Sequence, residues 1–138
     1  MKRILTLALL FSIVLLASSC KKEVTEVIQP NQTVFREVRA SDWVLKTDQQ
    51  TGAKTWSATL GVNQLDEYIH DNGGVLVYAS FDNGVYEQIP QVYNGIAYSM
   101  SYVPRAIQLD AQLSDYTNDD ISQPGDVSIK IVLIDSVP

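Results

Sequence analysis

Four aspartates lie close together in the sequence just before the last apolar segment of the chain. They are Asp115, Asp119, Asp120 and Asp126, with Asn118 among them. Calcium takes about six to eight oxygen ligands, and oxygen-rich loops at the end of a β-sandwich can supply them. The spacing does not follow the EF-hand pattern, so we favour a plain acidic loop and keep a calcium site as the alternative.

A single histidine limits the catalytic chemistry that the chain can carry. His70 is the only histidine and Cys20 the only cysteine, which in practice excludes a zinc site built from these residue types. A Ser-His-Asp arrangement would have to use His70, yet the sequence contains no Gly-x-Ser-x-Gly pattern. A carboxylate pair for glycoside hydrolysis is a spatial feature, and we interpret the scattered acidic residues as a solvated surface. We therefore expect a non-enzymatic protein, with a small envelope hydrolase as the least favoured alternative.

Aromatic residues near predicted strand ends and loops are the other candidates for binding. This set consists of Trp43, Tyr86, Tyr93 and Tyr116. Exposed rings of this kind stack on sugar faces or anchor a protein partner, whereas partly buried rings keep only a hydroxyl or indole N–H at the surface. A second set lies in alternating segments and is predicted to be core: Trp56, Tyr78, Tyr98 and Tyr102.

The cysteine follows a short apolar segment at the start of the chain. Lys2 and Arg3 precede residues 4–17, which are apolar apart from Thr6 and Ser12. This segment is shorter than the roughly 17–25 residues that a membrane-spanning helix needs. Positive charge, an apolar stretch and then small residues are typical of a secretory signal peptide. With one cysteine, no intramolecular disulfide can form. Cys20 is then either a free thiol behind an ordinary signal peptide or a cysteine that carries lipid.

Residues 16–20, Leu-Ala-Ser-Ser-Cys, resemble the lipobox of bacterial lipoproteins. Ala17 stands where leucine is commonest, a departure that is usual in Bacteroidetes lipoboxes. The resemblance implies cleavage before Cys20, a diacylglycerol thioether and an N-acyl chain on that cysteine, and a lipid bilayer as partner. Two or more acyl chains anchor a protein stably, at about 0.8 kcal/mol per buried methylene. Lys21 in place of an aspartate favours the outer membrane, on either its periplasmic or its cell-surface side.

Composition predicts one acidic domain behind the signal segment. The formal net charge is −6, and loss of Lys2 and Arg3 would leave two fewer basic residues and a net charge of −8. Such a chain is repelled by phosphate backbones, so we expect no nucleic-acid partner. We expect a signal peptide over 1–19, the lipidated cysteine and a tether over 20–32, and one domain over 33–138. Alternatively, the apolar residues within 24–28 begin a first strand.

Alternation of apolar and polar residues predicts several strands, each with one buried face. These strands cover residues 54–60, 96–102, 107–113 and 127–133. Residues 75–81 are apolar on both faces, which is typical of a central strand. Asn83-Gly84 and Asn94-Gly95 predict hairpin turns, Pro104 a corner or hairpin, and residues 116–125 a long exposed loop. The fold class is therefore all-β, an antiparallel sandwich of Greek-key, Ig-like or jelly-roll-like type.

One short helix is predicted between two of these strands. Asn63 is the expected N-cap, with acidic residues in the first turn and His70 in the last. Leu65, Tyr68 and Ile69 form an apolar stripe, and Gly73 is the expected stop. We expect this helix to connect strands 54–60 and 75–81 and to close one end of the sandwich.

The order of these features resembles that of small Bacteroidetes-type lipoproteins with a lipobox signal peptide. The matching features are a tryptophan-containing strand, a short helix, Gly74-Val75-Leu76-Val77-Tyr78, Ile89-Pro90 and a last aliphatic strand over 129–134. The resemblance supports the β-sandwich and implies no particular activity. We expect a non-catalytic binding or assembly module that contacts an envelope protein or a glycan, with a carbohydrate-binding accessory protein as the specific alternative.

Overall fold

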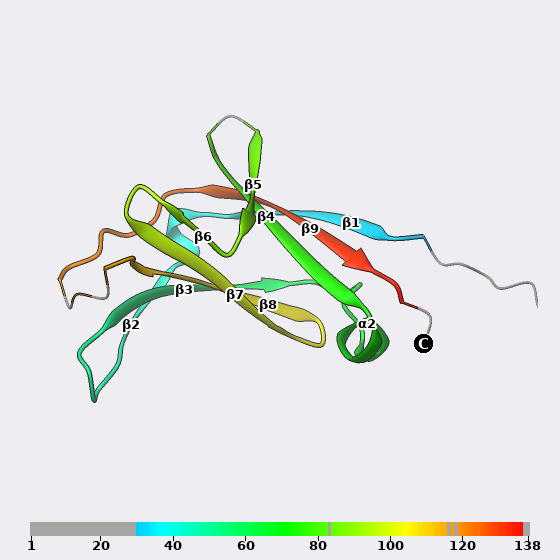
Figure 1. Ribbon diagram of the computed structural model, residues 1–138, viewed down its shortest axis with the longest axis horizontal. Coiled ribbons are helices and arrows are strands. Elements are labelled where there is room, and N and C mark those ends of the chain that lie inside the picture. The colour runs from blue at the N-terminus through cyan, green and yellow to red at the C-terminus, as the bar shows by residue number, and fades with distance from the viewer. Residues whose placement is uncertain (1–29, 83, 116, 118, 137–138) are drawn as a thin grey trace, which may run out of the picture.

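The computed structural model describes residues 30–82, 84–115, 117 and 119–136. Two antiparallel β-sheets pack face to face (Figure 1), which confirms the predicted all-β sandwich with one short helix. The signal segment, Cys20 and most of the expected tether lie outside the described residues. Within the described ranges, no helix is long and apolar enough to cross a membrane.

The first sheet has four strands, in the order β1-β9-β4-β5. Their bounds are Gln32–Val38 for β1, Val127–Ile134 for β9, Gly74–Asp82 for β4 and Val85–Ile89 for β5. β1 pairs with residues 127–133 of β9, although these are the first and last strands of the part of the chain that the structure describes. β4 lies between β9 and β5, so the predicted central position of residues 75–81 is confirmed.

The second sheet has five strands, in the order β2-β3-β8-β7-β6. Their bounds are Val44–Thr47 for β2, Lys54–Gly61 for β3, Ala106–Leu113 for β8, Ile96–Val103 for β7 and Gln91–Tyr93 for β6. The β6–β7 hairpin turns at Asn94 and Gly95, whose φ angles of 49° and 78° confirm the predicted positive-φ turn. Pro104 and Arg105 form the β7–β8 turn, so Pro104 marks a hairpin.

The core fills the space between the two sheets. β9 contributes Ile129, Ile131 and Leu133, and β8 contributes Ile107, none of them more than 1% exposed. The predicted alternation of residues 107–113 and 127–133 therefore reflects one face packed against the opposite sheet. Burying each such side chain contributes about 1.5–3 kcal/mol, so this layer is the main source of stability.

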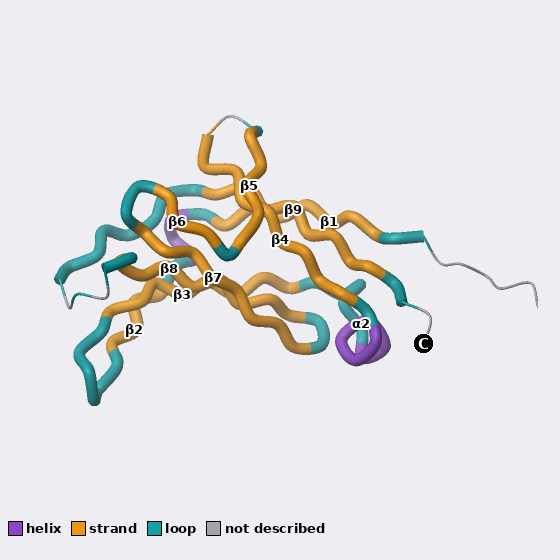
Figure 2. Tube along the Cα trace, viewed as in Figure 1, coloured by secondary structure: helices purple, strands orange, loops and turns teal. Residues whose placement is uncertain are grey.

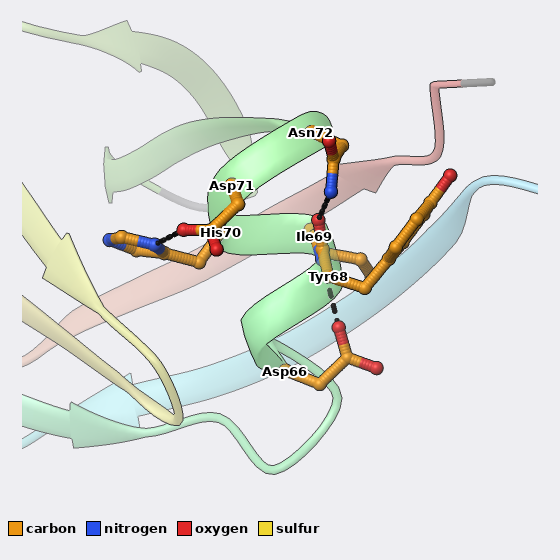
Figure 3. A network of polar contacts seen from close by, with 6 residues as sticks. All are labelled: Asp66, Tyr68, Ile69, His70, Asp71 and Asn72. Carbon is orange, nitrogen blue, oxygen red and sulfur yellow. Dashed lines mark hydrogen bonds and ion pairs between the residues drawn. The ribbon is translucent and has the colours of Figure 1, made fainter. Parts of the chain in front are cut away.

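The helix, α2, spans Glu67–Asn72 and closes one end of the sandwich between β3 and β4 (Figures 2 and 3). Its position in the chain is as predicted, but it begins later than predicted. The N-cap is Asp66, whose Oδ1 accepts a hydrogen bond of 2.9 Å from the Ile69 N–H, and not Asn63. Gly73 is the C-cap, as expected, and His70 lies in the last turn with Nδ1 2.6 Å from Asp71 Oδ1.

The predicted apolar stripe of the helix is only partly correct. Ile69 is buried within α2, and Leu65 is fully buried but precedes the helix. Tyr68 is 45% exposed and donates its hydroxyl hydrogen bond to the Ser136 carbonyl oxygen at 2.9 Å. A helix of six residues can bury only one residue against the sheets here, and Tyr68 lies outside that contact.

Candidate functional site: a polar groove on the five-stranded sheet

The outer face of the five-stranded sheet forms an open groove of about 470 Å³. Its walls are polar side chains from four neighbouring strands, together with the β2–β3 turn. The strand residues are Lys46, Thr47, Thr55, Ser57, Ser99, Gln108, Asp110 and Gln112. Alternation places these side chains outward because their sequence neighbours Trp56, Ala58, Leu109 and Ala111 pack inward.

Strand register brings the central residues of the groove side by side. Asp110 on β8 is paired with Ser57 on β3 and with Ser99 on β7. Side chains directly opposite each other on one face of an antiparallel pair lie about 4.5–5.5 Å apart at their Cβ atoms. A carboxylate therefore lies in the middle of the sheet with a hydroxyl group on each side.

A chain of hydrogen bonds crosses the floor of the groove. The Ser57 hydroxyl donates to Asp110 Oδ1 at 2.5 Å, and Ser57 is only 4% exposed. The Gln108 side-chain amide donates to both carboxylate oxygens of Asp110, at 3.0 and 2.9 Å. The Lys46 ammonium donates to Gln108 Oε1 at 3.4 Å. These contacts hold the carboxylate and the amide in fixed orientations before any ligand binds.

The β2–β3 turn forms one end of the groove and is itself rigid. Asp48 Oδ1 accepts hydrogen bonds from the backbone N–H groups of Gln50 and Thr51, at 2.9 and 2.7 Å, and from the Thr51 hydroxyl at 2.8 Å. These hydrogen bonds hold the pKa of Asp48 below its usual value, and those from Thr51 have the largest effect. Gly52 supplies the positive φ of 76° that the turn requires.

The sequence signal for this groove was present but not decisive. The outward residues of β3 and β8 were recognised only as the wet faces of two strands. β8 presents Gln108, Asp110 and Gln112 on its outward face, and nothing in this local pattern distinguishes a binding surface from an ordinary solvated strand face. The sequence pattern does not predict that Lys46 lines the groove, because β2 is too short to show a clear alternation.

Three of the four predicted calcium-ligand candidates take part in separate hydrogen bonds. Asp126 Oδ1 accepts from the Ala40 N–H at 2.7 Å, and Asp115 Oδ1 accepts from the Thr117 N–H at 3.2 Å. Asp120 pairs with Lys54, whose hydrogen bond and charge hold the pKa of Asp120 below its usual value.

The same aspartates are not gathered into a metal site in the part of the chain that the structure describes. There, no group of three or more His, Cys, Asp or Glu residues lies close enough to hold a metal ion. Asp119 is exposed, and Asn118 lies outside the described residues.

Of the two alternatives for the candidate binding aromatics, exposed or partly buried, Trp43 follows the second and is more fully buried than that alternative expects. Trp43 is 4% exposed and donates its indole N–H to the Gly125 carbonyl oxygen at 3.3 Å. Trp56 donates in the same way to the Ile121 carbonyl oxygen at 3.1 Å. The segment predicted as a wholly exposed loop therefore lies over both tryptophans, and its Ile121 and Pro124 are buried.

The tyrosines divide differently from the prediction. Tyr93 is half-buried and stacks on Phe81 with ring centroids 4.6 Å apart, and Tyr98 is 7% exposed, as predicted for a core residue. Tyr78 was predicted to be core, but it lies on the outer face of the four-stranded sheet, because Val77 and Ala79 take the inward positions. Tyr86 lies beside it on β5. Tyr116 lies outside the described residues.

Comparison with known proteins finds no protein-family model, curated protein or solved structure that matches this chain. The assignment of a function therefore depends on the chemistry of the groove and on the sequence features at the start of the chain.

Proposed function

We propose that the chain is a cell-envelope lipoprotein, anchored in the outer membrane through lipid on Cys20, whose sandwich is a non-catalytic binding module. The groove over β3 and β8 is its binding site, and its ligand is rich in hydroxyl groups, as a glycan is. The observation that carries the proposal is the ordered hydrogen-bond chain from Lys46 through Gln108 and Asp110 to Ser57. The lipobox-like segment and the single cysteine support the anchor.

The remaining hydrogen-bonding capacity of the groove suits hydroxyl groups. A carboxylate offers about four lone-pair sites, and Asp110 uses three of them for Ser57 and Gln108. The ammonium of Lys46 keeps donors beyond its one bond to Gln108. A hydroxyl group both donates and accepts, so it can bridge these two residue types. Fixed polar groups of this kind set the orientation and specificity of a small ligand.

A glycan array followed by calorimetry tests the binding site. The mature lipidated protein in detergent is screened first, and the best glycan is then titrated against Asp110→Asn. We expect at least tenfold weaker binding, which corresponds to about 1.4 kcal/mol, because the variant loses the charged acceptor and disturbs both partners of Asp110.

Asp119→Asn is the matched control, since it removes the same charge from an exposed position outside the groove. We expect it to bind like the unmodified protein. An array without a bound glycan contradicts the ligand class. Equal affinities for Asp110→Asn and Asp119→Asn contradict the groove as the binding site.

A further inference from the structure

The outer face of the four-stranded sheet carries an aromatic patch that the proposed binding site does not use. We name it the aromatic face and define it by Phe35, Tyr78, Tyr86 and Lys130, with Leu76 and Val132 beside them. Strand register places Phe35, Lys130, Tyr78 and Gln88 in one row across all four strands. Thr33, Val132 and Leu76 form the next row. Neither row contains a carboxylate.

The lysine at the centre of this face is held between two rings. Its ammonium lies 4.4 Å from the centroid of the Tyr78 ring and 4.8 Å from that of Tyr86. The Phe35 ring lies 6.3 Å from Tyr86 and is 59% exposed. A phenylalanine exposed to this extent beside two tyrosines and a cation is an amphipathic surface, because rings supply apolar area while hydroxyls and the ammonium remain polar.

The chain that leads to this face favours one occupant. β1 begins at Gln32 and carries Phe35, and only nine residues separate Pro30 from Cys20 in the sequence. Ten peptide steps span at most about 36 Å when fully extended. A lipid on Cys20 therefore keeps the start of β1 within about 36 Å of the membrane surface.

We propose that the aromatic face docks onto the surface of the bilayer that holds Cys20. This inference rests on the proposed lipid anchor. Tyrosine and phenylalanine rings enter the interfacial region of a bilayer, and a lysine beside them reaches lipid phosphates. The two sheets pack against each other through their inner faces (Figure 1), so their outer faces point in opposite directions. Docking through the aromatic face therefore turns the polar groove away from the membrane, toward ligands in solution.

The acidity of the chain sets the conditions for docking. The net charge of −8 that remains after loss of Lys2 and Arg3 opposes an anionic lipid surface, and Glu37 lies in the row that follows Phe35. The lipid anchor must therefore bring the domain close to the membrane, and the aromatic face then determines how the domain is oriented on it. Vesicles of phosphatidylcholine, which carry no net charge, are the appropriate probe.

Site-specific fluorescence measures the orientation. Lipidation consumes the thiol of Cys20, so Phe35→Cys provides a unique attachment point for a fluorophore in the full-length lipidated protein. Val103→Cys is the matched control, because Val103 is also 59% exposed but lies on β7 of the opposite sheet. The vesicles contain a phospholipid with a nitroxide quencher. We expect at least twofold stronger quenching at position 35 than at position 103, and Thr33→Cys to behave like Phe35→Cys.

Each outcome decides between this inference and its rivals. Equal quenching at positions 33 and 103, in protein that floats with the vesicles, overturns docking and leaves the lipid anchor standing, because Thr33→Cys keeps all four residues that define the aromatic face. Protein that does not float with the vesicles overturns both. Nanodiscs that hold one copy of the protein test whether a second copy covers the aromatic face instead. Quenching at position 35 that persists in these discs supports docking onto the bilayer. Quenching that requires several copies per disc overturns docking onto the bilayer.

Discussion

Tyr98 places a phenol group in the core of the sandwich. It is 7% exposed and lies 4.6 Å from Phe81, measured between ring centroids. Burial raises its pKa above the usual value of 10.0, and the neighbouring Tyr93 adds to the effect. The folded state therefore favours the neutral phenol, whereas the unfolded chain ionises as soon as the pH exceeds about 10.

This burial predicts a pH dependence that belongs to one residue. Above about pH 10 the unfolded state binds fewer protons than the folded state, so Tyr98 makes the stability fall as the pH rises. Tyr98→Phe removes this contribution. We expect the free energy of unfolding of the unmodified protein, measured in urea from pH 8 to 11, to decline relative to that of the variant only above pH 10. A constant difference over the whole range would contradict the assignment.

Trp43 gives a second prediction at this scale. Because Trp43, which follows η1 (Ala40–Asp42) in the sequence, is only 4% exposed, Trp43→Ala should lower the free energy of unfolding by about 3–5 kcal/mol. Trp43→Phe keeps most of the ring, and its loss of the hydrogen bond to Gly125 adds a smaller cost, about 0.5–1.5 kcal/mol. Chemical denaturation of the two variants separates the contribution of ring packing from that of the hydrogen bond. Equal losses would show that packing of the ring contributes little.

Among the elements, α2 shows most clearly what sequence patterns leave open. Asn63 and Asp66 are both good N-cap residues, and propensity does not choose between them. The β7–β8 turn makes the choice, because the Val62 N–H donates to the Arg105 carbonyl and the Arg105 N–H donates to the Leu65 carbonyl. These bonds tie residues 62–65 to a distant turn, so the helix can begin only at Glu67.

Gly73 ends the helix for a reason that differs from the usual one. Its φ of −95° is not in the left-handed region, so no positive φ requires glycine here. A Cβ at this position would lie 2.4 Å from the Ile134 carbonyl oxygen and 2.9 Å from that of Ile69. Glycine is therefore required by the close approach of α2 to the end of β9.

This contact predicts opposite results for two glycine variants. Gly73→Ala should cost about 1–3 kcal/mol, because backbone must move to admit the methyl group. Gly61→Ala is the control, since nothing lies within 4 Å of a Cβ built there, and we expect it to be neutral or slightly stabilising. Thermal and urea unfolding compare them, and similar stabilities for the two variants would refute the close-approach explanation.

At the scale of the whole molecule, period-two alternation predicted β3, β7, β8 and β9 and the side that each of them buries, but it did not predict the short strands β2, β5 and β6. It could not predict which sheet a strand joins, because Ser57 and Asp110 become neighbours only through pairing of segments more than fifty residues apart. The same limit explains why local pattern left the exposure of Trp43 open, because this residue is covered by a segment that lies 82 residues further along the chain. Local pattern therefore predicted the longer strands of the five-stranded sheet and their buried faces, while long-range pairing assembled the groove and the aromatic face.

The proposed anchor also belongs to the whole molecule. Cys20→Ser replaces the sulfur that would carry the diacylglycerol, so we expect the variant to leave the membrane fraction and to change its electrophoretic mobility. Fractionation of envelopes by sucrose gradient, with metabolic labelling by a fatty acid, provides the measurement. Unchanged membrane fractionation of the variant would contradict lipidation at this residue.

The position of β9 has a consequence for how the molecule is made. β9 is the last strand of the chain, yet it lies between β1 and β4, and β1 has no other partner in its sheet. During synthesis from the N-terminus, β1 gains its partner strand only after residue 127 and those that follow it have been made. Contacts between such distant segments form slowly, whereas the five-stranded sheet needs no residue beyond 113, so we expect the four-stranded sheet to be completed last.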